Sequence, residues 1–276
     1  MPETINDLYK LCIHTITTKP LNFEDACAAY SSNGIKGITI WRDAIAQIEP
    51  SKVRNIIEKN DLTIVSYCRG GFFPHTHEKK RFEAIEDNKQ MIDEAASIGA
   101  PMIVLVCGAD PDQSLETSRQ QIFEGITECL PLATENNIKL AIEPLHPMYA
   151  DTRSAISTME QANTLAEKIN SPIVGVAVDV YHLWWDPQLK KEIERCGKNK
   201  HLFAYHICDW KSPTNHMLLD RGLMGEGCIN LQEIRNWIEN AGFDGFHEVE
   251  IFSEKYWSQD QNLFLKKIVN AYVKHS

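Results

Sequence analysis

Four apolar runs in the second half of the sequence each end in a side chain that can bind a metal ion. The runs are Lys139-Leu-Ala-Ile-Glu143, Val174-Gly-Val-Ala-Val-Asp179, Phe203-Ala-Tyr-His206 and His247-Glu-Val-Glu250. A single residue of this kind could equally be an ordinary solvated polar residue at the end of a strand. That interpretation does not account for four such residues in consecutive runs. Carboxylates that converge would repel one another unless a divalent cation lay between them. We therefore predict one divalent metal ion, bound by Glu143, Asp179, His206 and Glu250.

The ligand types restrict the metal and its chemistry. Three oxygen ligands and one imidazole suit Mn²⁺, Mg²⁺ or Co²⁺ better than a structural zinc site, which would use thiolates. We expect Mn²⁺, although Zn²⁺ in an open catalytic site is also compatible. Such an ion can bind a ketone oxygen and an adjacent hydroxyl, and so stabilise the enediolate left when the neighbouring carbon loses a proton.

Two of the four residues are also candidates for proton transfer. Glu143 and Glu250 would flank the substrate, so that one abstracts the proton and the other returns it. The predicted activity is isomerisation or epimerisation of a sugar or cyclitol next to its carbonyl. The alternative is that either glutamate binds the metal ion but takes no part in proton transfer.

A regular alternation of strands and helices must position these residues. Eight β-branched runs predict strands, and most follow a helical pattern that ends in Gly or Asn. Alternating units of this kind form a parallel sheet, and eight of them favour a single (β/α)8 TIM barrel spanning residues 1–276. The rival open doubly wound sheet lacks its GxGxxG motif after the first strand. The predicted strands are Leu11–Ile16, Ile35–Trp41, Leu62–Tyr67, Pro101–Cys107, Ile138–Glu143, Ile173–Asp179, Leu202–Ile207 and Phe246–Phe252.

One predicted helix illustrates how the outer layer would cover the barrel. Between residues 81 and 98, Phe82, Ile85, Ile92 and Ala96 form one apolar stripe, and charged residues occupy the rest of the surface. We expect the stripe to pack on the strands.

Composition and charge narrow the partners. The net charge of −10 and the pI of about 5.5 disfavour binding along phosphate backbones, so we expect no nucleic acid. No apolar run approaches the length of a membrane span, and the first residues do not read as a signal peptide. The eight cysteines include no CxxC pair and are expected to be reduced and mostly buried. These features predict a cytoplasmic protein; the oligomeric state is open, a homodimer being one option.

Several strings resemble the sugar isomerase/epimerase superfamily of xylose-isomerase-like barrels, which includes ketose 3-epimerases and inosose isomerases and dehydratases. The resemblance covers essentially the whole chain. It implies the same four metal ligands, and substrate contacts from His182, three residues after Asp179, and from Arg221, just before a glycine-rich turn. The strings are Ala141-Ile-Glu-Pro144, Val178-Asp-Val-Tyr-His182, His206-Ile-Cys-Asp209, Asp220-Arg-Gly-Leu-Met-Gly-Glu-Gly227 and Glu248-Val-Glu-Ile-Phe252.

Other polar and aromatic residues complete the predicted site or fall outside it. His146 and Trp41 are expected to contact substrate, and Trp184, Trp185 and Trp210 either close the pocket or belong to the packing. His182 could instead be a structural partner of Asp179, and Arg221 a partner of Asp209 or Asp220. We interpret Glu248 as a buried structural acid, and His75 and His77 as surface residues.

Two other reactions fit the same residues. A lyase or dehydratase would form the same intermediate from a keto-sugar, keto-glycoside or inosose and then expel a neighbouring oxygen group. An abasic-site endonuclease of this barrel group would need three zinc ions and a His two residues after an Asp beyond strand seven, where Asp209-Trp-Lys211 has none. Without a phosphate-binding glycine loop, we expect an unphosphorylated sugar or cyclitol.

Overall fold

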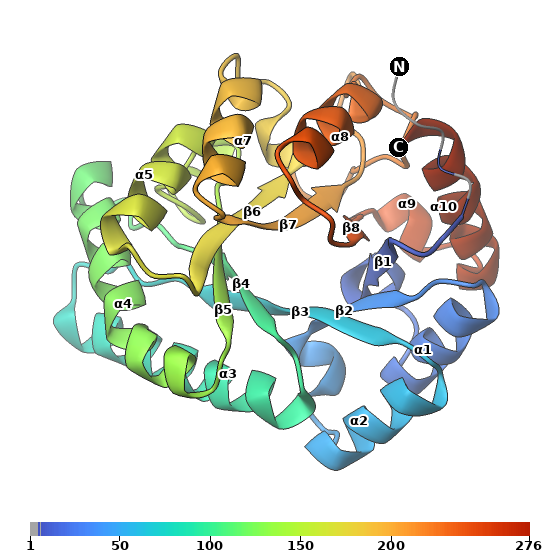
Figure 1. The fold of residues 1–276 in the computed structure, drawn as a ribbon, viewed down its shortest axis with the longest axis horizontal. Helices are drawn as coiled ribbons and strands as arrows, with labels where there is room; N and C mark the ends of the chain where they lie inside the picture. Colours follow the sequence, from blue (N-terminus) through green and yellow to red (C-terminus); the bar gives the residue numbers. More distant parts are fainter. Residues whose placement is uncertain (1–4, 6) are drawn as a thin grey trace.

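The computed structural model describes residue 5 and residues 7–276, and its centre is a closed barrel of eight parallel strands (Figure 1). Each strand pairs with its neighbours in sequence order, and β1 closes the ring by pairing with β8. The predicted (β/α)8 barrel is thus confirmed, and the open doubly wound sheet is excluded. The strands are β1 (Leu11–His14), β2 (Gly37–Trp41), β3 (Thr63–Gly71), β4 (Met102–Val106), β5 (Lys139–Glu143), β6 (Val174–Asp179), β7 (Leu202–Ile207) and β8 (His247–Val249).

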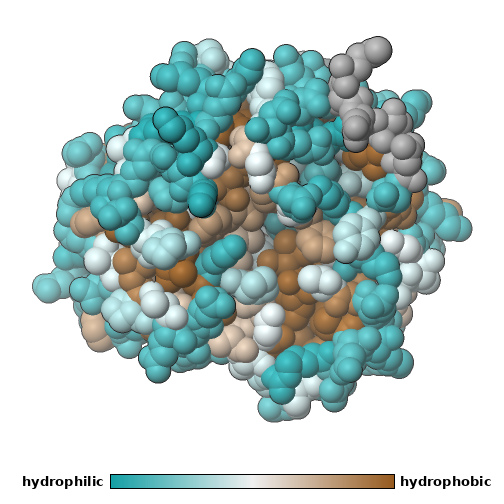
Figure 2. Space-filling model, viewed as in Figure 1, coloured by the Kyte–Doolittle hydropathy of each residue, from teal (hydrophilic) through white to brown (hydrophobic). Residues whose placement is uncertain are grey.

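Helices surround the barrel and carry the polar surface. Figure 2 shows hydrophilic side chains spread over the periphery, with hydrophobic ones visible between and beneath the helices. Gly99 and Gly242 take positive φ values of 80° and 92° just beyond two helix ends, as the stop signals predict. The helices are α1 (Phe23–Ser32), α2 (Pro50–Lys59), α3 (Glu78–Ile98), α4 (Leu115–Glu135), α5 (Met159–Ile169), α6 (Val180–Leu183), α7 (Leu189–Lys198), α8 (Leu231–Asn240), α9 (Glu254–Trp257) and α10 (Gln261–His275), with 3-10 turns η1 (Thr15–Thr18), η2 (Arg42–Ile45) and η3 (Pro147–Tyr149).

A main apolar core and a smaller inner one hold the barrel together. The larger lies between the strands and the helices, and a smaller one fills the interior of the barrel. Ala141, Ala177 and Ala204 belong to the inner core, on β5, β6 and β7. Because side chains alternate along a strand, the residue two positions further on each strand also faces the interior, one layer nearer the carboxyl end. The fold therefore directs three predicted metal ligands into one layer above the alanines.

The carboxyl ends of three strands, β1, β3 and β8, differ from the predicted ends by two or more residues. β1 stops at His14 and turns into η1, and β8 stops at Val249. β3 instead continues to Gly71, whose N–H donates to Asn88 Oδ1 (2.7 Å) and whose carbonyl accepts from Asn88 Nδ2 (2.8 Å). Gly71 has a φ of 104°, and a Cβ atom there would lie 2.1 Å from the Val106 carbonyl oxygen, so only glycine fits. Four more residues of this strand thus reach the barrel mouth.

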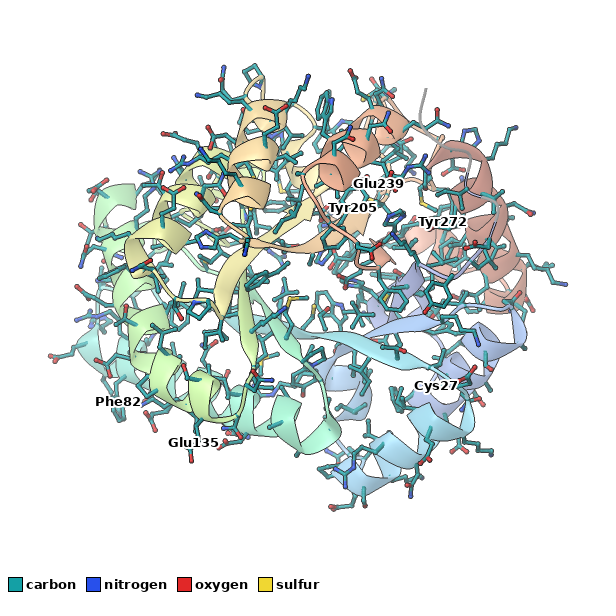
Figure 3. All side chains as sticks on the ribbon, viewed as in Figure 1. Cys27, Phe82, Glu135, Tyr205, Glu239 and Tyr272 are labelled. Atoms are coloured by element: carbon teal, nitrogen blue, oxygen red, sulfur yellow. The ribbon has the colours of Figure 1, made fainter. Side chains whose placement is uncertain are left out.

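The predicted stripe of α3 is wrong at Phe82, whose side chain is 62% exposed and lies at the outer edge of the molecule (Figure 3). The helix is oriented by Asn88, which is bonded to Gly71. At 100° per residue, Phe82 lies about 120° around the helix from Asn88. The buried face consists of Asn88, Met91, Ile92, Ala95 and Ile98.

Two further predictions can be compared with the structure. Seven of the eight cysteines are buried, which confirms mostly buried thiols, and none of the eight is joined to another in the structure. None of the helices formed by the described residues has the length and hydropathy needed to span a membrane.

Candidate metal centre and active site

The four predicted metal ligands meet at the carboxyl ends of β5 to β8. One donor atom from each lies within 4.8 Å of the other three, and all four side chains are buried. Glu143 and Asp179 end their strands, and Asp179 pairs in register with His206 on β7. Glu250 is the first residue after β8, where its N–H donates to the Ile207 carbonyl.

The donor atoms fit a divalent cation. Glu143 Oε1 and His206 Nδ1 lie 2.9 Å apart, close enough for an ion pair, but neither atom makes a hydrogen bond of good geometry with any residue that the structure describes. Buried polar atoms without partners are rare and costly, so atoms that converge in this way are suited to a shared ligand. Three carboxylates and one imidazole are a donor set that Mn²⁺, Mg²⁺ and Zn²⁺ accept.

Arg221 joins two of these carboxylates. Its Nη1 donates to Asp179 Oδ2 (3.0 Å) and to Glu250 Oε2 (2.7 Å), and the residue is only 2% exposed. Arg221 does not pair with Asp209 or Asp220, the alternative partners considered from the sequence. Asp220 pairs with Lys211 instead. Arg221 therefore holds two ligands in place, whatever it contacts in a substrate.

Burial and charge perturb the ionisation of this group. Burial raises the pKa of Asp179 to about 7, against the opposing charge of Arg221. Burial also disfavours ionisation of Glu250, but Arg221, His14 and His206 together outweigh it and hold the pKa of Glu250 well below its usual range. Burial and Arg221 together lower the pKa of His182 far below its usual value, so this imidazole is neutral. Its Nε2 accepts the Arg221 Nη2–H at 3.1 Å.

A second buried network lies beside the four ligands and contains His14, which the sequence analysis did not single out. His14 Nδ1 is 3.3 Å from Glu250 Oε1, and its Nε2 is 3.3 Å from Glu248 Oε2. Glu248 Oε2 also accepts hydrogen bonds from Thr39 Oγ1 (2.5 Å) and Ser66 Oγ (2.9 Å). Glu248 is 1% exposed, consistent with a structural acid. The network fixes the ring of His14 against Glu250.

The predicted substrate contacts divide into two groups. Trp41, His182 and Arg221 line a small cavity, about 20 Å³ in volume, that also contains Glu143 and Glu250. His146 does not line it. Instead its ring stacks on Trp210 (centroids 5.2 Å apart) and meets Trp185 edge-on (5.6 Å). His146 and the tryptophans thus form an aromatic cluster beside the mouth, and a substrate contact by His146 stays a prediction.

His75 and His77 lie apart from the metal centre. Their rings are 5.3 Å apart, His77 is exposed, and neither belongs to a group of metal-binding side chains within the part of the chain that the structure describes. The position of His77 agrees with a surface residue, whereas His75 is half-buried and its Nδ1 accepts the His77 N–H.

Comparison with known proteins places this fold in a family. The family model described as the xylose isomerase-like TIM barrel matches residues 27–268. The chain belongs to that family. Among curated xylose isomerase-like relatives, an inosose isomerase of Bacillus licheniformis is 26% identical over 190 residues, covering 67% of this chain and 66%, just under two thirds, of the relative. A probable endonuclease 4 of Mesomycoplasma hyopneumoniae is 25% identical over 188 residues, covering 64% and 66%.

Solved structures of this family share the whole barrel. A crystal structure of a Sinorhizobium meliloti 1021 protein has a TM-score of 0.93 and 42% identity, covering 96% of this chain and 98% of its own. The IolI protein with a bound zinc atom has a TM-score of 0.84 at 20% identity, with 96% of each chain covered. The Escherichia coli 3-keto-D-glucoside 4-epimerase has a TM-score of 0.78 at 16% identity, covering 96% and 99%. The last two likenesses establish the fold alone.

In this xylose isomerase-like barrel, Asp209 has a structural part. Its Oδ1 accepts the N–H groups of Trp210 and Ile229, and its Oδ2 accepts those of Gly225 and Gly227. Both carboxylate oxygens are therefore occupied in shaping the loop after β7. This use of Asp209 leaves little capacity for the additional zinc ions of an abasic-site endonuclease.

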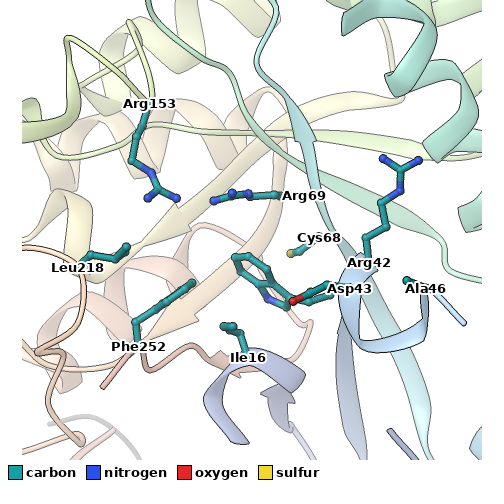
Figure 4. Close-up of a pocket in the computed structure, with 10 residues that line it drawn as sticks. Ile16, Arg42, Asp43, Ala46, Cys68, Arg69, Arg153, Leu218 and Phe252 are labelled. Atoms are coloured by element: carbon teal, nitrogen blue, oxygen red, sulfur yellow. The ribbon is translucent and has the colours of Figure 1, made fainter. Parts of the chain in front are cut away.

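Two residues at the mouth were missed by the sequence analysis. Arg69, on β3, and Arg153, in the loop after η3, line a cavity of about 600 Å³ that adjoins the metal centre (Figure 4). Arg69 would have been a candidate had β3 been predicted to reach Gly71. Arg153 lies in an irregular loop, where no periodic pattern identifies it.

Proposed function

We propose that the protein is a divalent-metal-dependent isomerase or epimerase that acts on a ketone of a sugar or cyclitol. The observation that carries the proposal is the convergence of four buried donors within 4.8 Å at the barrel mouth, two of whose atoms lack hydrogen-bond partners among the described residues. The ligands would be Glu143, Asp179, His206 and Glu250. When bound, a divalent ion would supply Lewis-acid polarisation of a ketone oxygen, which acidifies the neighbouring C–H bond.

The two glutamates would move the proton. Glu143 and Glu250 both line the small cavity where a substrate carbon would lie, and they come from the non-adjacent strands β5 and β8. Arg221, His14 and His206 together keep Glu250 ionised and so able to accept a proton, whereas neutral His182 can hydrogen-bond a substrate oxygen. Each glutamate can therefore serve a different side of the same carbon.

The relatives support a small-molecule isomerase. Four inosose isomerases are among the curated proteins that match this chain, at 24–26% identity. The chain also matches probable endonucleases, but the net charge of −10 and the occupied carboxylate of Asp209 argue against phosphodiester cleavage here. A lyase shares the first proton abstraction and is separated from an isomerase by the product.

The test is exchange of substrate hydrogen with solvent deuterium. Protein treated with chelator and reloaded with Mn²⁺, Co²⁺ or Zn²⁺ would be incubated in D₂O with a panel of ketoses, ketose phosphates, keto sugar acids, inososes and 3-keto-glycosides. We expect metal-dependent deuterium incorporation next to the carbonyl, read by mass spectrometry and NMR. Loss of water or of an alcohol would identify a lyase instead.

Matched variants locate the activity. Glu143→Gln removes a carboxylate at the site, and Glu116→Gln makes the same change on the exposed surface of α4. We expect exchange to fall by about 10²-fold or more in the first variant and to be unchanged in the second. Full exchange by metal-loaded Glu143→Gln would refute the role of this glutamate, and no exchange with any ketone in the panel would refute the proposed function.

A further inference from the structure

A cavity of about 600 Å³ adjoins the metal centre and extends the space available to a substrate. It shares Trp41, Arg69, Arg153 and Phe252 with the small cavity that contains Glu143 and Glu250. A molecule whose reacting carbons lie at the metal centre would therefore place its far end against these shared residues. Their chemistry determines what that far end carries.

Two guanidinium groups face each other across this cavity. Figure 4 shows the side chains of Arg69 and Arg153 approaching from opposite sides, with their charged ends directed toward one another. Neither makes an ion pair or a side-chain hydrogen bond with any residue among 5 and 7–276. Burial lowers the pKa of Arg69, and the positive charge of Arg153 lowers it further. Glu143 and Glu250 line the adjoining small cavity and attract Arg69, but neither carboxylate forms an ion pair with Arg69 or Arg153.

The other arginines of the two cavities are neutralised. Arg42 lines the larger cavity but bonds to Glu94 through Nε and Nη2 (2.8 Å each) and to Asp87 through Nη1 (2.7 Å). Arg221 is paired with two carboxylates at the metal centre. In a chain with a net charge of −10, Arg69 and Arg153 are half-buried arginines whose guanidinium groups make neither an ion pair nor a hydrogen bond with the described residues, which packing alone does not explain.

Aromatic rings hold both guanidinium groups in place. Arg69 lies over the rings of Trp41 (5.5 Å to the centroid) and Phe72 (5.0 Å), and Arg153 lies over Tyr149 (5.5 Å). Such cation–π contacts orient a guanidinium without using its N–H donors. The donors remain available for the oxygens of a carboxylate or phosphate, which a planar guanidinium binds in a bidentate manner.

We propose that Arg69 and Arg153 together bind an anionic group, a carboxylate or a phosphate ester, at the end of the substrate remote from the reacting carbons. The inference rests on the proposed function for the position of the reacting carbons. It narrows the substrate class from neutral sugars and cyclitols to sugar acids or sugar phosphates.

The test measures binding rather than turnover, with polyols that have no carbonyl and so cannot react. The Mn²⁺-loaded full chain would be titrated calorimetrically with D-gluconate, sorbitol 6-phosphate and neutral sorbitol. The variants Arg69→Gln and Arg153→Gln would be compared with Arg54→Gln, the same charge change at an exposed position on α2. Thermal unfolding of each variant would establish that it is folded.

We expect at least one anion to bind tenfold or more tighter than sorbitol. Each mouth variant should weaken that binding by about 10- to 100-fold, whereas sorbitol binding and Arg54→Gln should be unaffected. Tighter binding of gluconate assigns a carboxylate, and tighter binding of sorbitol 6-phosphate a phosphate. Equal affinity for anions and sorbitol, no detectable binding of either anion, or an anion preference that persists in both mouth variants would overturn the proposal. A confirmed anion site without deuterium exchange would refute the proposed function alone.

Discussion

Replacing Arg221 by methionine should destabilise the metal-free protein strongly, because it leaves two buried carboxylates without their shared counter-charge. Asp179 and Glu250 are 0% and 4% exposed, so water cannot replace the guanidinium. Removing one partner of a buried ion pair costs about 3–5 kcal/mol. An unfolding entropy of about 2.1 cal/mol/K per residue over this chain converts that loss to a fall in Tm of about 5–9 °C.

A matched arginine at the surface provides the control. Arg42 also bonds two carboxylates, but Glu94 and Asp87 have side chains 30% and 60% exposed. Arg42→Met should therefore cost only about 0.5–1 kcal/mol, or less than 2 °C. Differential scanning calorimetry of both variants, with and without Mn²⁺, measures the difference.

The effect of added metal separates electrostatics from packing. A cation that takes over the neutralisation of Asp179 and Glu250 should raise the Tm of Arg221→Met by more than it raises that of the wild type. Equal Tm losses in the two arginine variants, or equal recovery with metal in Arg221→Met and wild type, would refute this reasoning.

Three further predictions concern the surroundings of the site and the barrel. Glu248→Gln should weaken Mn²⁺ binding by about 10- to 100-fold, measured by competition with a chelating dye, because His14 loses a charged partner that fixes it; unchanged affinity would contradict this. Asn88→Ala should lower the free energy of unfolding in urea by about 1–3 kcal/mol, whereas Phe82→Ser should change it by less than about 0.5 kcal/mol. Equal losses in the two variants would show that Asn88 does not lie on the buried face of α3 with Phe82 outside it. Burial lowers the pKa of His247 to about 3. Because the imidazole is protonated at a higher pH in the unfolded chain than in the folded one, the free energy of unfolding should fall as pH drops below about 6.5. Urea midpoints measured from pH 7 to pH 5 should show a shallower fall in His247→Gln than in the wild type.

The convergence of the candidate metal ligands was predictable from sequence because parallel strands impose a simple rule. Glu143, Asp179 and His206 each follow, by two positions, a small residue of the inner barrel, so alternation alone directs all three inward. Closure of the barrel then brings their strand ends to one mouth. The apolar runs therefore indicate directly which strand-end side chains face the interior of the barrel.

The rest of the site depends on contacts that no local pattern encodes. His14 also ends an apolar run, but the predicted strand continued to Ile16 and concealed the change of direction at η1. Arg69 was missed because the bonds between Asn88 and Gly71, which extend β3, join residues 17 positions apart. Phe82 was wrongly placed for the same reason, since Asn88 sets the rotation of α3. Tertiary hydrogen bonds of this kind override periodicity.

The metal content of the purified chain tests the central claim most directly. Wild type, Asp179→Asn and the surface control His75→Gln would be stripped with chelator, reloaded with Mn²⁺, desalted and measured by elemental analysis. We predict one ion per chain in wild type and His75→Gln, and none retained in Asp179→Asn, which keeps the size of the side chain but loses its charge. Equal metal content in Asp179→Asn and wild type, or no bound metal in the wild type, would contradict a metal centre at the ends of β5 to β8.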